Sequence, residues 1–182
     1  MDASDKTALA EKAMGNWYLQ SRHEFIARLA SKALAGRAPG ECRILDAGCG
    51  SGGVSGRLLA KGYNVVGCDM DEDSIRQGVA QGRLRDVHRA DVARLPFEDN
   101  SFDLVICSEV LEHVPDEEAL RSLLRVARKD VLLSVPAHAY LWMPSDTILG
   151  HLRRYSRADV KELVARSGAS LVKLGACGMI PG

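Results

Sequence analysis

The chain has 182 residues, 24 basic and 24 acidic side chains and a formal net charge of zero. This length suits one domain with a buried core, and the balanced charge argues against a nucleic-acid partner, which usually selects a basic excess. No apolar run approaches the roughly 20 residues of a membrane-spanning helix, and the N-terminus is too charged for a signal peptide. We therefore expect a cytoplasmic protein that binds neither nucleic acid nor a membrane.

Helical and strand-forming segments alternate along the chain. Residues 6–35 predict a helix, and further helices are predicted at 51–61, 71–81, 115–128 and 156–167. Strands are predicted at 42–47, 63–69, 85–90, 102–108, 130–135 and 171–176. This alternation predicts an α/β fold: a Rossmann-like, doubly wound, mostly parallel sheet with helices on both faces.

The stretch RILDAGCGSGG at residues 43–53 organises this pattern. A short strand ends at Asp46, and a glycine-rich turn leads into a helix. Free backbone N–H groups and the positive end of the helix dipole form an anion site there. Gly48, Gly50 and Gly53 also match the dinucleotide fingerprint, with Asp69 about twenty residues on. A NAD(P)-dependent oxidoreductase is therefore one interpretation.

Acidic and polar residues follow several predicted strands, and the carboxyl ends of parallel strands meet at one edge of a sheet. They are Asp46, Asp69, Asp91, Ser108-Glu109 and the segment 136–138. Asp46 beside the glycines would repel a pyrophosphate and attract a sulfonium or an ammonium group. Asp91 with the following Leu-Pro-Phe loop suits a single adenine. The pattern favours one nucleoside with a cationic amino-acid tail.

Four segments resemble class I S-adenosylmethionine (SAM)-dependent methyltransferases, particularly the small-molecule methyltransferase type 11 group. They are ILDAGCGSG (44–52), VVGCDMD (65–71), ADVARLPFEDNSFDLVICSEVLEHV (90–114) and LLSVP (132–136), and the resemblance covers roughly residues 40–176. It implies transfer of a methyl group from SAM to a small-molecule acceptor, leaving S-adenosylhomocysteine (SAH). A SAM-binding regulatory protein without catalysis is an alternative.

The resemblance also implies roles for single residues. Asp46 and the turn Gly48–Gly52 would hold the methionyl part, Asp69 the ribose hydroxyls, and Ser108 and Glu109 the methyl-donor end. Met70, Asp91 and Val92 would surround the adenine. The expected cofactor residues are Asp46, Gly48, Cys49, Gly50, Gly52, Asp69, Met70, Asp91, Val92, Ser108, Glu109 and Tyr18. Tyr18 belongs to an N-terminal helical segment, residues 1–40, that would act as a lid over the domain formed by residues 41–182.

The segment 137–155 shows little periodicity and resembles one found in a type 11 subgroup. We expect it to be a substrate cap, because long irregular loops in compact domains are usually functional. Its expected substrate residues are Trp142, Asp146, Arg154 and Tyr155. The alternative is structural: Arg154 and Asp146 pin the loop by a salt bridge and His151 caps a helix.

Three histidines are candidate general bases near pH 7: His113, His138 and His151. We predict that His113 starts the helix after the strand 102–108. No metal site is predicted, because the spacing of His138, Asp146 and His151 is not diagnostic and the five cysteines show no C-x-x-C pair.

The family sheet usually has seven strands, but six are predicted here and the sequence ends at Gly182. An open edge at the sixth strand would favour association. We therefore expect a homodimer.

Overall fold

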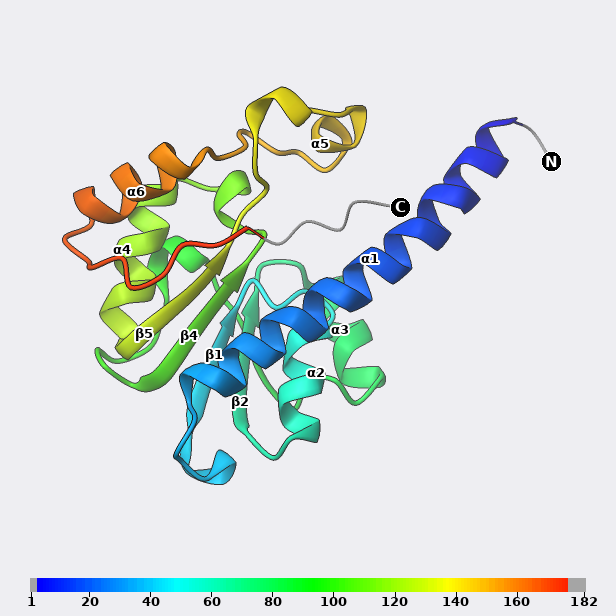
Figure 1. Cartoon of the computed structure of the whole chain (residues 1–182). Helices are drawn as coiled ribbons and strands as arrows, with labels where there is room; N and C mark the ends of the chain where they lie inside the picture. Colours follow the sequence, from blue (N-terminus) through cyan, green and yellow to red (C-terminus); the bar gives the residue numbers. More distant parts are fainter. Residues whose placement is uncertain (1–2, 177–182) are drawn as a thin grey trace.

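A computed structural model describes residues 3–176, and the side chains of residues 17–176. Five strands form one sheet in the order β3-β2-β1-β4-β5 (Figure 1). They are β1 (Arg43–Ala47), β2 (Asn64–Asp69), β3 (Asp86–Arg89), β4 (Phe102–Ser108) and β5 (Ala127–Ser134). All neighbouring strands pair in parallel. The predicted doubly wound α/β fold is therefore confirmed.

Helices connect the strands at nearly the predicted positions. The α-helices are α1 (Ala3–Ala33), α2 (Gly53–Ala60), α3 (Glu72–Ala80), α4 (Asp116–Val126), α5 (Pro144–Ile148) and α6 (Arg157–Arg166). Short 3-10 helices are η1 (Pro39–Glu41), η2 (Val92–Arg94), η3 (Leu111–His113) and η4 (Ala139–Leu141). Helices η4 and α5 lie inside the segment 137–155, which is thus less irregular than its sequence suggests.

Two hydrophobic cores cover the two faces of the sheet. Side chains of successive strand residues point to opposite faces, so Ile44 packs with Ile26 of α1 and Leu58 of α2. Its neighbour Leu45 packs on the other face with Leu123 of α4. Helices α1 and α2 thus cover one face, and α4 and α6 cover the other (Figure 1).

The predicted strand at residues 171–176 is wrong, because the structure forms no strand there. Leu171 and Val172 are 40% and 89% exposed. Within the described part of the chain, these apolar side chains are therefore not buried as they would be in a strand of the sheet. The homodimer was expected to form through the edge of a sixth strand, and residues 3–176 contain no sixth strand. The homodimer itself stays a prediction. Cys177 and the final residues 179–182 lie outside the described part of the chain.

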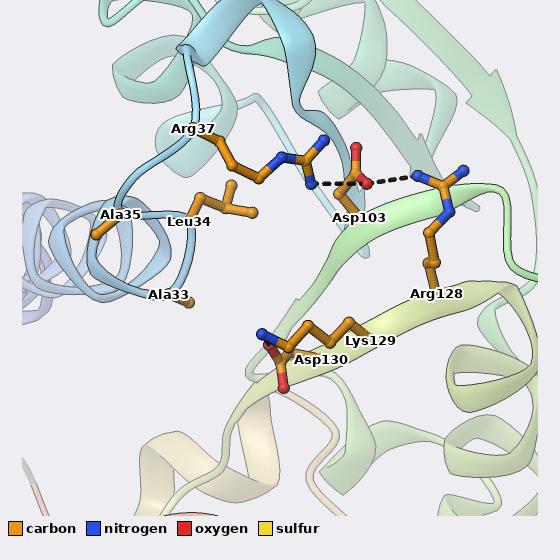
Figure 2. A pocket seen from close by; sticks show the side chains of 8 residues that line it. All are labelled: Ala33, Leu34, Ala35, Arg37, Asp103, Arg128, Lys129 and Asp130. Carbon is orange, nitrogen blue, oxygen red and sulfur yellow. Dashed lines mark hydrogen bonds and ion pairs between the residues drawn. The ribbon is translucent and has the colours of Figure 1, made fainter.

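A buried aspartate ties the amino ends of the strands to the end of α1 (Figure 2). Asp103 is 6% exposed, accepts a hydrogen bond of 2.9 Å from the Arg43 backbone N–H, and pairs with Arg37 and Arg128. Burial acts to raise the pKa of Asp103, but these hydrogen bonds outweigh it and lower the pKa to about 2. The surrounding pocket, which Lys129 also lines, lies at the end of the sheet opposite the glycine turn.

The substitution Asp103→Asn should destabilise the protein at neutral pH. A carboxylate whose pKa lies below its unfolded value contributes stability above that value and loses it as the pH falls through the folded pKa. The wild type should exceed the variant by about 2 kcal/mol in unfolding free energy at pH 7, and the gap should close between about pH 4 and pH 2. Urea unfolding across this range measures it, with Glu98→Gln, at an exposed carboxylate, as the control. A pH-independent gap would contradict this account.

Candidate functional site

The glycine turn between β1 and α2 needs glycine for its backbone geometry. Gly48, Gly50 and Gly52 have φ angles of 74°, 49° and 77°, a region that other residues rarely adopt. A Cβ at Gly48 would lie 2.2 Å from the Val110 side chain, whereas a Cβ at Gly50 would meet nothing within 4 Å. The turn is therefore packed at Gly48 and open at Gly50, where a ligand can approach the backbone.

Asp46 supports this turn from within. It is 2% exposed, and its Oδ2 accepts hydrogen bonds from the Ser55 backbone N–H (3.1 Å) and hydroxyl (2.6 Å). Burial raises the pKa of Asp46 to about 6, against the lowering effect of the Ser55 hydrogen bonds. Asp46 thus holds the first turn of α2, and its expected contact with the methionyl part stays a prediction.

The turn is attached to the end of β2. The backbone N–H groups of Gly48 and Cys49 donate to the carbonyl of Cys68, at 2.8 and 3.0 Å. Asp69 then accepts the Gly50 N–H through Oδ2 (2.7 Å) and the Asp71 N–H through Oδ1 (2.9 Å). A partly exposed carboxylate therefore lies beside the open point of the turn.

The other expected cofactor residues divide into exposed and buried groups. Met70 is 54% exposed directly after Asp69. Asp91 is exposed at the end of β3 and begins η2 by accepting the Ala93 N–H at 2.9 Å. Cys49 and Val92 are buried, so their side chains shape the loops rather than offer an open surface.

A chain of polar side chains joins the carboxyl ends of β4 and β5 to the interior of α1. The hydroxyls of Ser108 and Ser134 lie 2.8 Å apart, and the Ser134 hydroxyl donates to Glu109 Oε1 at 2.9 Å. Glu109 Oε2 pairs with Arg22 of α1 at 3.1 Å. The Arg22 guanidinium lies 5.7 Å from the ring centre of Tyr18. The structure thus brings the N-terminal helix to the expected donor end, and Ser134 is a site residue that the sequence did not reveal.

His23 of α1 packs on the start of α2. A Cβ at Gly53 would lie 2.2 Å from the His23 ring, so this close contact requires glycine. Burial, followed by the charges of Arg22, Arg57 and Arg83, lowers the pKa of His23 to about 4. A neutral imidazole therefore lies against the glycine turn at neutral pH.

The segment 137–155 is held by a buried carboxylate. Asp146 is 1% exposed and accepts hydrogen bonds from Arg154 Nε (2.9 Å), Arg154 Nη2 (2.8 Å), His151 Nδ1 (2.7 Å) and the Met143 N–H (2.7 Å). The Arg154 hydrogen bonds are the main cause of an Asp146 pKa well below its usual range. The salt bridge expected as the structural alternative is therefore present. Asp146 and Arg154 hold the cap in shape, and their contact with a substrate stays a prediction.

The remaining cap residues differ in exposure. The Tyr155 hydroxyl is buried within hydrogen-bond distance of the Leu111 carbonyl (3.1 Å) and Asp116 (3.0 Å). Burial, followed by the Asp116 charge, raises the pKa of Tyr155 well above its usual range. Trp142 is 44% exposed, and its indole N–H donates to Thr147 at 3.2 Å. Trp142 is thus the more accessible of these two predicted substrate residues.

Two of the three candidate histidines meet. The rings of His113 and His151 lie 4.8 Å apart in an edge-to-face arrangement. His113 belongs to η3, and Pro115 separates it from α4, so the prediction that it starts the long helix is wrong. His138 is exposed and has a φ of 62°. Its ring lies 5.1 Å from the Tyr140 ring in a tilted arrangement.

Glu112, beside His113, is a residue that the sequence analysis did not single out. It is fully buried, and neither carboxylate oxygen has a hydrogen-bond partner. Burial raises the pKa of Glu112 to about 8.

The substitution Gly53→Ala should cost about 1–3 kcal/mol of stability, because the new methyl group overlaps the His23 ring. In a His23→Ala background the same change should cost less than about 0.5 kcal/mol. Urea unfolding of the four proteins in this double-mutant cycle measures the coupling. Gly40→Ala, where a Cβ would meet nothing within 4 Å, is the matched control. Equal costs in both backgrounds would exclude the steric explanation.

The substitution Arg154→Gln should loosen the cap, because it leaves the buried Asp146 charge without its two guanidinium bonds. Breaking such a buried pair costs on the order of 3 kcal/mol. Amide hydrogen exchange should therefore accelerate across residues 139–152 and stay unchanged in β1 and β4. Arg157→Gln, at an exposed position on α6, is the control. Unchanged exchange in the cap would contradict the role of Arg154.

Known proteins resemble this chain in sequence over much of its length. Residues 45–135 match the family model of a methyltransferase domain. A probable S-adenosylmethionine-dependent methyltransferase of Mycolicibacterium smegmatis is 30% identical over 83% of this chain and 59% of the relative. A ubiquinone biosynthesis O-methyltransferase of Hahella chejuensis is 40% identical over 50% of this chain and 40% of the relative. The chain thus spans about half the length of these curated relatives.

Solved structures share the fold. Magnesium protoporphyrin IX methyltransferase from Synechocystis PCC 6803, with bound SAH, superposes with a TM-score of 0.69 and 22% identity, over 87% of this chain and 78% of that one. Among residues 3–176, no helix is long and apolar enough to cross a membrane. The match to half of the chain and the shared fold show that this protein belongs to the family of class I SAM-dependent methyltransferases.

Proposed function

We propose that the protein transfers a methyl group from SAM to a small-molecule acceptor and releases SAH. The observation that carries the proposal is the junction of the glycine turn with β2. There the Asp69 carboxylate bonds to the N–H of Gly50, at the point where the turn is open. Bound at this junction, SAM supplies a methyl group already activated by its sulfonium.

The exposed residues at the strand ends fit a nucleoside. A carboxylate has two acceptor oxygens, so Asp69 would accept the ribose hydroxyls and Asp91 the adenine amine. Met70, half exposed directly after Asp69, would cover one face of the adenine. Open backbone near Gly50 would take the amino-acid tail. The buried Asp46, Cys49 and Val92 would act by shaping these loops, and Gly48 and Gly52 by their backbone geometry.

The acceptor would bind between the strand ends and the cap. Methyl transfer needs close alignment of donor and acceptor and exclusion of water. We assign these tasks to the cap 137–155, with Trp142 as an exposed contact, and to α1 as a lid, with Tyr18 near the donor end beside Ser108 and Glu109. His113, His138 and His151 stay candidate general bases for the acceptor; His113 and His151 lie together, whereas His138 is exposed. We place this activity in the cytoplasm.

The substitution Asp69→Asn should lower the affinity for SAH by about 10–100-fold, because hydrogen bonds to a charged group contribute roughly 1.5–3 kcal/mol. The amide keeps the shape and one acceptor oxygen for the Gly50 N–H, while the Asp71 N–H loses its partner. Calorimetric titration measures the change. Asp86→Asn, an exposed residue at the opposite end of β3, should bind like the wild type.

The same titration separates the competing interpretations. Binding of NAD(H) in place of SAH would favour the oxidoreductase. SAH binding with no SAM turnover across a metabolite panel would favour a regulatory protein. No SAH binding by the wild type would refute the proposal.

A further inference from the structure

Three side chains from two distant segments converge where η3 meets the cap. Glu112 and His113 come from η3, and His151 comes from the cap after α5. One carboxylate oxygen or ring nitrogen from each lies within 4.8 Å of the others. His113 Nε2 lies 4.0 Å from Glu112 Oε1. A backbone hydrogen bond joins the two segments: the Leu152 N–H donates to the Glu112 carbonyl at 2.8 Å.

Both imidazoles are oriented through Nδ1. His151 Nδ1 lies 2.7 Å from Asp146 Oδ1, and His113 Nδ1 lies 3.3 Å from the Gly150 carbonyl. Each of these oxygens can only accept, so each Nδ1 is the donor, and the neutral form of each ring then has its lone pair on Nε2. Metal-binding histidines show the same arrangement, with the second nitrogen donating to a carboxylate or a carbonyl.

Glu112 supplies an observation independent of the histidines. It is fully buried, and both oxygens lack a hydrogen-bond partner. Buried polar side chains nearly always have partners, and an exception calls for an explanation such as an ion. Arg22, whose charge acts on Glu112, makes its ion pair with Glu109 instead. An ion bound by all three side chains would satisfy the carboxylate.

We propose that Glu112, His113 and His151 bind one divalent transition-metal ion. Two imidazoles and one carboxylate are the ligand set of catalytic Zn²⁺ sites and of non-haem Fe²⁺ sites, whereas Mg²⁺ and Ca²⁺ prefer oxygen ligands alone. Metal–ligand distances of roughly 2.0–2.2 Å put two ligand atoms of a tetrahedral ion about 3.4 Å apart, so side-chain rotations must bring the three ligand atoms closer than their present separations of up to 4.8 Å. The sequence could not predict this site, because its ligands have no characteristic spacing.

The site has an open side. The His113 side chain is 35% exposed, whereas those of His151 and Glu112 are 10% and 0% exposed. Solvent therefore reaches the ion past His113, and three protein ligands leave coordination positions for water or an oxygen donor. The ion would also join η3 to the cap. Metal binding does not require that the proposed methyl transfer is correct.

The test uses the full chain, without an affinity tag and treated with a chelator. Titration with Co²⁺ should produce visible d–d absorption bands that saturate at one equivalent, and Zn²⁺ should displace the Co²⁺. Zn²⁺ should raise the melting temperature, and excess EDTA should reverse the rise. Mg²⁺ should cause neither change.

Variants assign the ligands. Glu112→Gln keeps the shape of the side chain, and His151→Ala and His113→Ala each remove one imidazole; each should weaken Co²⁺ binding at least 100-fold. His88→Ala, an exposed histidine on β3, should bind Co²⁺ like the wild type. Should any variant fail to fold by circular dichroism, the other two and the wild-type melting shift decide the question.

Two results would overturn the proposal: a wild type that binds no stoichiometric Co²⁺ or Zn²⁺, or binding that the three ligand variants leave unchanged. Titration of the metal-free protein with SAH tests the proposed function separately, because none of the three ligands belongs to the expected cofactor residues.

Discussion

The hydrogen bonds between the glycine turn and the end of β2 are the constraint on which the site depends. Gly48 and Cys49 donate to Cys68, and Gly50 donates to Asp69. The turn is thus held against the neighbouring strand, so that an acidic side chain lies beside open backbone. Carboxyl ends of parallel strands are where such folds bind ligands. Parallel pairing within the sheet keeps β1 and β2 in register, and this register holds the turn and Asp69 side by side.

A second buried acid organises the segment 137–155 in the same way. Asp146 gathers Arg154, His151 and the start of α5 into one hydrogen-bonded unit. An ionised carboxylate is costly to bury unless donors surround it, and four hydrogen bonds meet that need here. The cap is therefore a folded unit with its own polar centre.

Local patterns allowed the sheet and the glycine turn to be predicted. β4 is recognisable from its apolar run, and α6 begins with a capping box formed by Ser156 and Asp159. Asp69 and Asp91 were recognisable because each lies at the carboxyl end of a strand: Asp69 is the last residue of β2, and Asp91 comes two residues after β3. The false strand at residues 171–176 shows the limit of such patterns, because β-forming residues need a neighbour to cover them.

Contacts between distant segments were not predictable. Neither Glu112 nor Ser134 belongs to a recognisable local pattern. Ser134 matters because it bonds to Ser108 and Glu109, far away in the sequence, and Glu112 because it is buried without a hydrogen-bond partner. From the sequence, Asp46 could either contact a ligand or support α2. Its burial and its hydrogen bonds to Ser55 show that it supports α2.

Helix α1 belongs to both the core and the site. Ile26, Ala30 and Leu34 are buried against the sheet, while Arg22, about one turn earlier, pairs with Glu109 at the end of β4. A helix anchored in this way cannot swing open as a rigid body without exposing the core. The lid proposed for this helix would therefore open by bending or fraying before His23 rather than by a rigid-body swing. Changes to the core contacts of α1 would then alter the rate of ligand exchange without touching the ligand.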